Sequence, residues 1–311
     1  MAVTGLLVRT TYPLFWLSLV VYPLGRHSSG MKSIDALASW GARGAHSLDE
    51  LAELFVPRFC AACRSYGEPM RGRRALCPRC SRLLNIATLN LLMTELTYAP
   101  CPVASSGEYE YELAHCLLSF KNAARTDLLS YLGSALARSL VFLCQEVGLT
   151  QVSGKDASVY LVPIPSSRQS VGRRGFAPAS DITRAASKLL PSTYPGVNFT
   201  VLEALRPLYP GEGAKVLTGH AKGSQKQLGQ QARYWRMQGS LRVRQPALSW
   251  VGRSLDLSGR VCIICDDVAT TGASIAEAYR VLSEAGACVI GAAAVARVQR
   301  RSEQPSPQNT S

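Results

Sequence analysis

The sequence predicts an α/β protein, an open and mainly parallel sheet flanked by helices, preceded by a small zinc-ribbon-like module. Three observations predict this fold class. Short apolar runs typical of buried parallel strands alternate with helical patterns in the second half of the chain. One of these runs ends in two adjacent acids and a Thr-Thr-Gly loop. Two Cys-x-x-Cys pairs precede all of these elements.

Composition limits the possible classes of protein. Of the 311 residues, 47% are hydrophobic and 18% are charged, so the chain can bury a sizeable core and is not mainly disordered. Lys and Arg number 34 against 21 Asp and Glu, and the net charge of +13 favours polyanionic partners such as phosphates, nucleic acid or anionic lipid. Ten cysteines are too few for a disulfide scaffold, and their scatter fits a reducing, cytoplasmic location.

The two ends of the chain are expected to lie outside the folded domains, at residues 1–47 and 301–311. An apolar stretch from Tyr12 to Leu24 looks like part of a signal peptide, but Pro13 and Pro23 bracket it and it is shorter than the ~18 residues that cross a bilayer. One interpretation is an extension from an upstream start codon or an unordered tail. The other is a membrane anchor or secretion signal. We favour the first, so stable membrane insertion is not expected.

A four-cysteine module is predicted over residues 48–97. Cys60-Ala61-Ala62-Cys63 and Cys77-Pro78-Arg79-Cys80 are separated by thirteen residues. Each pair can turn two thiolates toward one point, and two pairs complete the tetrahedral all-sulfur shell of structural zinc. Such a shell leaves no open position for catalysis. The alternative, short-loop disulfides or redox dithiols, accounts less well for two matched pairs. The predicted ligands are Cys60, Cys63, Cys77 and Cys80.

The same segment is strongly basic. Seven arginines and one acid between Arg58 and Arg82 give it a net charge of +6. Contact with nucleic-acid phosphates is one interpretation, and a solvated surface or a patch that docks an acidic partner is the other. Tyr66 is the aromatic residue well placed between the two cysteine pairs for base stacking.

An α/β domain is predicted over residues 98–300. Its first expected element is a short strand at Tyr109–Tyr111, where the residues alternate as in a strand. Residues 113–145 have helical spacing, and Phe120-Lys121-Asn122 is expected to separate two helices there.

The next elements resemble the surroundings of an anion site. Residues 157–164 are a short apolar run of the kind found in buried parallel strands. The polar turn Pro165-Ser166-Ser167-Arg168 follows, and a helical pattern covers residues 178–190. Strand, polar turn, basic residues and helix are the order in which backbone N–H groups converge on an anion. Residues 206–244 hold eight Lys and Arg against one acid, and we expect a mobile loop there.

The most informative segment begins at Val261. Five apolar residues predict a central strand, with Asp266 and Asp267 at its carboxyl end. A helix is expected over residues 274–285, with Gly286 placed to end it, and a further strand over residues 288–295. Ligands of open α/β sheets bind at the carboxyl edge of the strands.

The chemistry of this segment predicts a ribose-5-phosphate site. Backbone amides and hydroxyls at the helix N-terminus can hold a phosphate monoester, and Gly272 permits close approach of the backbone. Asp266 and Asp267 can accept hydrogen bonds from two vicinal sugar hydroxyls. The P-loop pattern GxxxxGK[ST] is absent from the sequence, which argues against an NTPase. The predicted phosphate loop consists of Thr270, Thr271, Gly272, Ala273 and Ser274.

These features resemble type I phosphoribosyltransferases, and more closely the ComF family of competence-associated, phosphoribosyltransferase-like proteins. The resemblance extends over about residues 48–298 and begins with the cysteine pairs. The remaining motifs that carry it are Phe120-Lys121, Val162–Pro165, Arg174-Gly175-Phe176, Gln225–Leu228 and Asp266–Ser274.

The resemblance implies roles for individual residues. The phosphate loop would hold the 5-phosphate of phosphoribosyl pyrophosphate (PRPP), and Asp266 and Asp267 its ribose hydroxyls. Mg²⁺ would bind with PRPP, largely through substrate and water oxygens. The pyrophosphate would lie against Pro165, Ser166 and Ser167. Arg168 and two lysines of the flexible loop, Lys222 and Lys226, would stabilise pyrophosphate as it leaves.

The resulting functional hypothesis is an enzyme that transfers phosphoribosyl to an unidentified acceptor, releases pyrophosphate and is linked to DNA uptake. The alternative is a non-catalytic module of the uptake machinery that binds single-stranded DNA or the competence helicase. A third interpretation is a regulator that senses PRPP without turnover. An enzyme must close its basic loop over PRPP, which a binding module need not do.

Overall fold

The computed structural model describes residues 59–66, 75–149, 157–194, 197–208, 237–244 and 255–299. The chain divides into two compact units, Met1–Val56 and Pro57–Ser311, and all described residues belong to the second. The predicted terminal segments, residues 1–47 and 301–311, lie outside the described residues. The helices are α2 (Pro78–Ala87), α3 (Tyr111–Ala123), α4 (Leu129–Glu146), α6 (Arg168–Arg174), α7 (Pro178–Ser187), α8 (Leu190–Thr193) and α10 (Ala273–Glu284), with a 3₁₀ turn at Thr126–Leu128.

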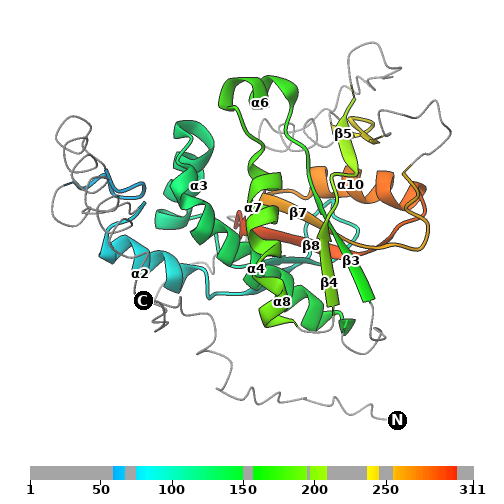
Figure 1. Ribbon diagram of the computed structural model, residues 1–311, viewed down its shortest axis with the longest axis horizontal. Coiled ribbons are helices and arrows are strands. Elements are labelled where there is room, and N and C mark those ends of the chain that lie inside the picture. Colours follow the sequence, from blue (N-terminus) through cyan, green and yellow to red (C-terminus); the bar gives the residue numbers. More distant parts are fainter. Residues whose placement is uncertain are drawn as a thin grey trace, which may run out of the picture. The chain divides into compact units, whose positions relative to one another are not determined.

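A six-stranded sheet forms the centre of this unit, with the order β1-β2-β8-β7-β3-β4 (Figure 1). Strand β7 lies between β8 and β3 and pairs in parallel with both, whereas the edge strand β1 is antiparallel to β2. Strands β5 and β6 form a separate antiparallel pair. The predicted open, mainly parallel sheet is confirmed. The strands are β1 (Leu92–Thr94), β2 (Val103–Ser105), β3 (Ala157–Pro163), β4 (Val197–Val201), β5 (Leu205–Pro207), β6 (Leu241–Val243), β7 (Val261–Ala269) and β8 (Cys288–Arg297).

Helices cover both faces of the sheet because the strands are apolar on both sides. Successive side chains of β7 point to opposite faces. Ile263 and Cys265 belong to the core formed with α4 and α7, which lie side by side in Figure 1. Cys262 and Ile264 belong to the core formed with α10. Cys262 and Cys265 are therefore buried core residues, as their apolar context predicts.

Helix α4 packs its apolar side against α7 and against strands β8 and β2 of the sheet. Together with the preceding turn, Thr126–Glu146 is the one stretch among the described residues that is long and apolar enough to span a membrane. In its most apolar window, 56% of the residues are buried inside the protein. A core helix passes the same length and composition test, so this stretch is weak evidence for a membrane span.

Two predicted elements in the first part of the domain are wrong. Residues Tyr109–Tyr111 make no strand: a single bridge joins Glu108 to Arg297, and α3 already begins at Tyr111. The Tyr111 side chain is 77% exposed, so the alternation does not mark a buried sheet face. The helix break also falls later than Phe120-Lys121-Asn122, at Ala124, whose left-handed φ of 49° ends α3.

The four-cysteine segment packs against the α/β domain. Leu76 and Leu84, on either side of the second cysteine pair, share one hydrophobic core with Leu117 and Phe120 of α3. The boundary proposed between residues 97 and 98 stays a prediction. Strand β1, on the module side of that boundary, pairs with β2 in the central sheet.

Candidate functional site

Among the described residues, the two acids and the Pro165–Ser167 turn lie at the carboxyl ends of two neighbouring strands, β7 and β3. Strand β7 continues through Asp266 and Asp267 to Ala269, so the acids lie inside the strand and not after it. The Ile164 N–H, just beyond β3, donates to the Cys265 carbonyl (2.9 Å). This contact places the Pro165–Ser167 turn beside the acidic end of β7, the edge of the sheet where ligands of α/β proteins bind.

Gly272 forms the turn from β7 into α10. Its φ is +83°, in the region that favours glycine. A Cβ at this position would lie 2.8 Å from the Ala99 backbone nitrogen and 3.0 Å from Leu96 Cβ, so the loop leaves no space for a side chain. The phosphate loop is thus held tightly against the segment that precedes β2.

Among the described residues, some hydrogen-bond donors of the loop have no partner. The first bond into the helix runs from the Ala276 N–H to the Gly272 carbonyl (2.8 Å), so the N–H groups of Ala273 and Ser274 precede the helical ladder. Thr271 is only 8% exposed, yet its Oγ1 has no partner within the described part of the chain. Buried hydroxyls are normally hydrogen-bonded. An orphaned hydroxyl beside free N–H groups at a helix N-terminus fits a phosphate.

The two acids at the end of β7 have different surroundings. Asp267 Oδ1 forms an ion pair with Lys121 Nζ of α3 (2.8 Å), and its side chain is 13% exposed. Asp266 Oδ1 accepts a hydrogen bond from the Asp267 N–H (2.8 Å). Burial and the neighbouring Asp267 carboxylate raise the pKa of Asp266, and the Lys121 ammonium opposes that shift. The acids form one charged cluster with Lys121.

Lys121, which contacts the acid pair, was not assigned to the site by sequence reasoning. Its only signal was the Phe120-Lys121 pair within the family resemblance. The structure places Phe120 fully buried, with its ring 5.0 Å from that of Phe176 in an edge-to-face contact. The Phe-Lys and Arg-Gly-Phe motifs therefore meet, and the contact orients the end of α3 toward the acids.

The remaining predicted pyrophosphate residues are partly placed. Ser167 caps α6, a short helix that the sequence did not predict, and its Oγ accepts a hydrogen bond from the Ser170 N–H (3.2 Å). Arg168 is the first residue of α6. Lys222 and Lys226 lie outside the described residues, so their catalytic role stays a prediction.

The four predicted metal ligands converge on one point. Their sulfur atoms all lie within 4.8 Å of one another, and Cys63 Sγ is 3.9 Å from Cys77 Sγ. Four sulfurs around zinc at about 2.3 Å would be about 3.8 Å apart. A hydrogen bond with Ser65 lowers the pKa of Cys63 to about 6, whereas burial raises the pKa of Cys80. None of the cysteines forms a disulfide, and the donor set fits a metal ion such as zinc.

Backbone contacts hold the two cysteine pairs together. The Ala61 N–H donates to the Ala75 carbonyl (3.0 Å), which joins the first knuckle to the chain before the second. The Cys77 N–H points at Cys60 Sγ (3.4 Å) and the Cys80 N–H at Cys77 Sγ (3.5 Å). N–H groups directed at sulfur stabilise thiolates and orient them, as outer-sphere contacts do in metal sites.

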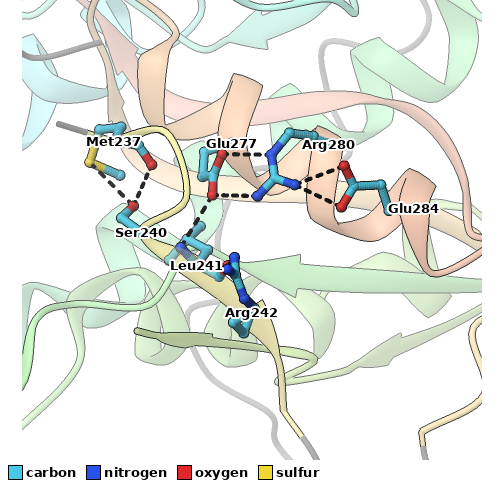
Figure 2. Close-up of polar contacts among 7 residues, drawn as sticks. All are labelled: Met237, Ser240, Leu241, Arg242, Glu277, Arg280 and Glu284. Carbon is cyan, nitrogen blue, oxygen red and sulfur yellow. Dashed lines mark hydrogen bonds and ion pairs between the residues drawn. The ribbon is translucent and has the colours of Figure 1, made fainter. Parts of the chain in front are cut away.

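Strand β6, near the end of the predicted basic loop, is anchored to α10 by a buried acid. Figure 2 shows Glu277 between Arg280 and the backbone of Leu241. Glu277 Oε1 accepts from the Leu241 N–H (3.3 Å) and from Arg280 (2.8 Å), and Arg280 also binds both oxygens of Glu284. The Glu277 side chain is 2% exposed. Residues 209–236 of the basic segment lie outside the described residues.

Replacing Arg280 by alanine is expected to lower the free energy of unfolding by about 3 kcal/mol, because it leaves a buried carboxylate without its cation. Urea denaturation measures the change. Arg184→Ala is the matched control, since Arg184 also pairs with two acids, but its side chain is 51% exposed and those of Asp181 and Glu203 are 30% and 33% exposed, against 2% for Glu277. That variant should lose less than about 1 kcal/mol. Equal losses in the two variants would contradict a structural role for the Glu277 contact.

A cavity of about 430 Å³ adjoins the phosphate loop. Tyr98 and Pro100 form one wall, Gln238 contributes from the segment before β6, and Ala273, Ala276 and further residues of α10 form the floor. Ala273 belongs both to this cavity and to the phosphate loop. The cavity therefore lies within reach of any ligand held at the N-terminus of α10.

The fold and the site fit a phosphoribosyltransferase-type α/β domain with a four-cysteine cluster at its N-terminal side. Residues 220–310 match the family model of the phosphoribosyl transferase domain. That match covers β6, β7, α10 and β8, and so includes the acids and the phosphate loop.

The other comparisons add less. Among curated proteins, none matches the chain. Among solved structures, the chain is similar to TT1426 from Thermus thermophilus, with 18% sequence identity and a TM-score of 0.25, over 56% of this chain and 84% of that one.

Proposed function

We propose that the protein binds PRPP with Mg²⁺ at the carboxyl end of β7 and transfers its phosphoribosyl group to an acceptor, with release of pyrophosphate. The observation that carries the proposal is the buried hydroxyl of Thr271, which has no hydrogen-bond partner among the described residues and lies in the same loop as the first N–H groups of α10, directly after the acid pair. The match of residues 220–310 to a phosphoribosyl transferase domain supports it.

In this proposal, different residues bind different parts of PRPP. Thr270–Ser274 hold the 5-phosphate through N–H groups and hydroxyls, and Asp266 and Asp267 accept hydrogen bonds from the ribose hydroxyls. Pro165–Ser167 and Arg168 contact the pyrophosphate end, and Lys222 and Lys226 approach it from the basic segment. Mg²⁺ takes mostly substrate and water oxygens, as it does at other phosphate sites.

In the same proposal, the cysteine cluster holds a structural zinc ion, and the protein is a cytoplasmic member of the ComF family that acts in DNA uptake. The order of motifs along residues 48–298 supports the family assignment, since the cysteine pairs precede the Phe-Lys, Arg-Gly-Phe and Asp-Asp motifs. The sulfur positions support zinc, because their separations fit a tetrahedral shell.

Calorimetric titration of the full chain with PRPP and Mg²⁺ tests the proposal. Wild type is expected to bind, and the double variant Asp266→Ala/Asp267→Ala is expected to bind at least about 100-fold more weakly, because two charge-assisted hydrogen bonds are lost. Asp256→Ala serves as the control, since Asp256 is exposed and lies before the opposite end of β7. Absence of binding to a folded wild type would reject the site, and a screen of bases and amines for pyrophosphate release would follow a positive result.

A second candidate function, binding of single-stranded DNA or a helicase partner, is favoured by an aromatic pair next to the cysteines. Phe59 is 44% exposed and Tyr66 is 69% exposed, and their rings lie edge to face at 5.7 Å. The exposed side chain of Arg64 lies between them in sequence. Aromatic rings beside arginines can stack on bases and contact phosphates. Binding to an oligonucleotide that weakens steeply with salt, and is lost in Tyr66→Ala, would support this function.

A further inference from the structure

The side-chain ammonium of Lys121 contacts the acid pair at the end of β7. Lys121 Nζ lies 2.8 Å from Asp267 Oδ1, and the Lys121 side chain is only 24% exposed. Its positive charge also acts on Asp266. The Lys121 ammonium opposes the rise in the pKa of Asp266 that burial and the Asp267 carboxylate cause. Carboxylate oxygens can accept hydrogen bonds from the two hydroxyls of a ribose.

The position of Lys121 depends on the cysteine knuckles, which hold the chain on both sides of it. Before it, the Ser119 hydroxyl donates to the Ala61 carbonyl (2.8 Å), and Ala61 lies inside the first Cys-x-x-Cys pair. After it, the Arg125 guanidinium donates to the carbonyls of Phe59 (2.9 Å) and Ala75 (3.2 Å). Phe59 directly precedes the first metal ligand, and Ala75 lies two residues before the third.

The packing beneath these contacts is apolar and buried. Leu117 and Phe120 of α3 are fully buried in a core that includes Cys60 and Leu76 of the cysteine segment. A shift of either knuckle would therefore move the last turn of α3, because close-packed interiors transmit displacement and do not absorb it. The last turn of α3 is the part that carries Lys121.

We propose that Lys121 is a positioning residue for the ribose-binding carboxylates, and that a metal ion bound by the four cysteines fixes the position of the Lys121 side chain. Occupancy of the cysteine cluster and binding of PRPP are then energetically coupled. The inference rests on the proposed function. By linkage, the factor by which bound metal raises the affinity for PRPP equals the factor by which bound PRPP raises the affinity for the metal.

The first measurement is the PRPP dissociation constant of zinc-loaded wild type and of Lys121→Met, by calorimetry with Mg²⁺. The variant is expected to bind at least about 10-fold more weakly, in the range of measured coupling energies, and to keep one zinc per chain. Lys121→Arg is expected to recover most of the affinity, because it keeps the charge. The matched control is Lys188→Met, since Lys188 is exposed at the end of α7 and should leave the affinity unchanged.

The second measurement separates positioning from general destabilisation. Zinc removal by a chelator is expected to weaken PRPP binding by wild type but to add little to the loss already present in Lys121→Met, the signature of two changes that act through one residue. Competition with a chromogenic chelator then measures zinc affinity directly. PRPP is expected to raise it in wild type and not in Lys121→Met.

The possible results distinguish failure of the proposed function from failure of the inference about Lys121. A wild type that binds no PRPP overturns the proposed function and this inference with it. A wild type that binds PRPP, with Lys121→Met equally tight, overturns the inference alone. Equal losses on zinc removal in wild type and Lys121→Met would show that the metal acts by another route and would also overturn it.

Discussion

Cys63→Ser is expected to release the metal and lower the melting temperature by about 10 °C, although the Cys63 side chain is exposed. Because the thiol is not part of a packed interior, its replacement by serine removes little buried apolar surface. It does remove one of four thiolates that lie within 4.8 Å of one another. Loss of a contact outside the ligand shell already costs about 10–100-fold in metal affinity, and loss of a ligand costs more.

The temperature shift follows from linkage. A metal at about 1,000 times its dissociation constant adds about 4 kcal/mol to the free energy of unfolding. For a chain of this size, 1 kcal/mol corresponds to about 2–4 °C. Zinc stoichiometry by metal analysis and melting by calorimetry give the two readouts. Chelation of wild type should produce the same shift as the substitution.

Cys288→Ser is the control for this variant. Cys288 is also exposed, at the start of β8, and lies outside the cysteine cluster. It should keep one zinc per chain and the wild-type melting temperature. A Cys63→Ser protein that retains zinc and has the melting temperature of wild type would contradict a metal site at the four cysteines.

The features that could be predicted from the sequence are those whose chemistry is local in the chain. Asp266–Ser274 holds acids, loop and helix start within nine consecutive residues, and their order, strand then turn then helix, could be predicted, although β7 continues through both acids to Ala269. Each Cys-x-x-Cys pair is equally local. The thirteen residues between the pairs did not reveal how the knuckles join, which depends on the contact between Ala61 and Ala75.

The features that the sequence could not reveal join distant segments. The Lys121–Asp267 ion pair connects α3 to β7, and the Leu241–Glu277 hydrogen bond connects β6 to α10. No periodicity in either segment reports on such a pair. The wrong strand at Tyr109–Tyr111 has the same origin: alternation is a local pattern, whereas strand formation there depends on how far β8 extends beside it.

Gly272→Ala is expected to weaken PRPP binding by about 100-fold while the protein stays folded. Two separate effects act on the loop. A φ of +83° costs an alanine about 1–2 kcal/mol. The new methyl would also lie 2.8 Å from the Ala99 nitrogen, a backbone atom that cannot rotate away. The loop must shift, and its N–H groups leave the positions from which they bind the phosphate.

Gly259→Ala separates these two effects. Gly259 has a φ of +68°, and an added Cβ there would meet nothing within 4 Å. It should lose about the same 1–2 kcal/mol in unfolding free energy as any alanine at positive φ, and keep its affinity for PRPP. The difference in PRPP affinity between the two variants then measures the effect of the steric displacement of the phosphate loop. The expected 100-fold change corresponds to the loss of two hydrogen bonds of about 1.5 kcal/mol each. If both variants bind PRPP as tightly as wild type, the phosphate is held elsewhere, and the N-terminus of α10 is only a helix start.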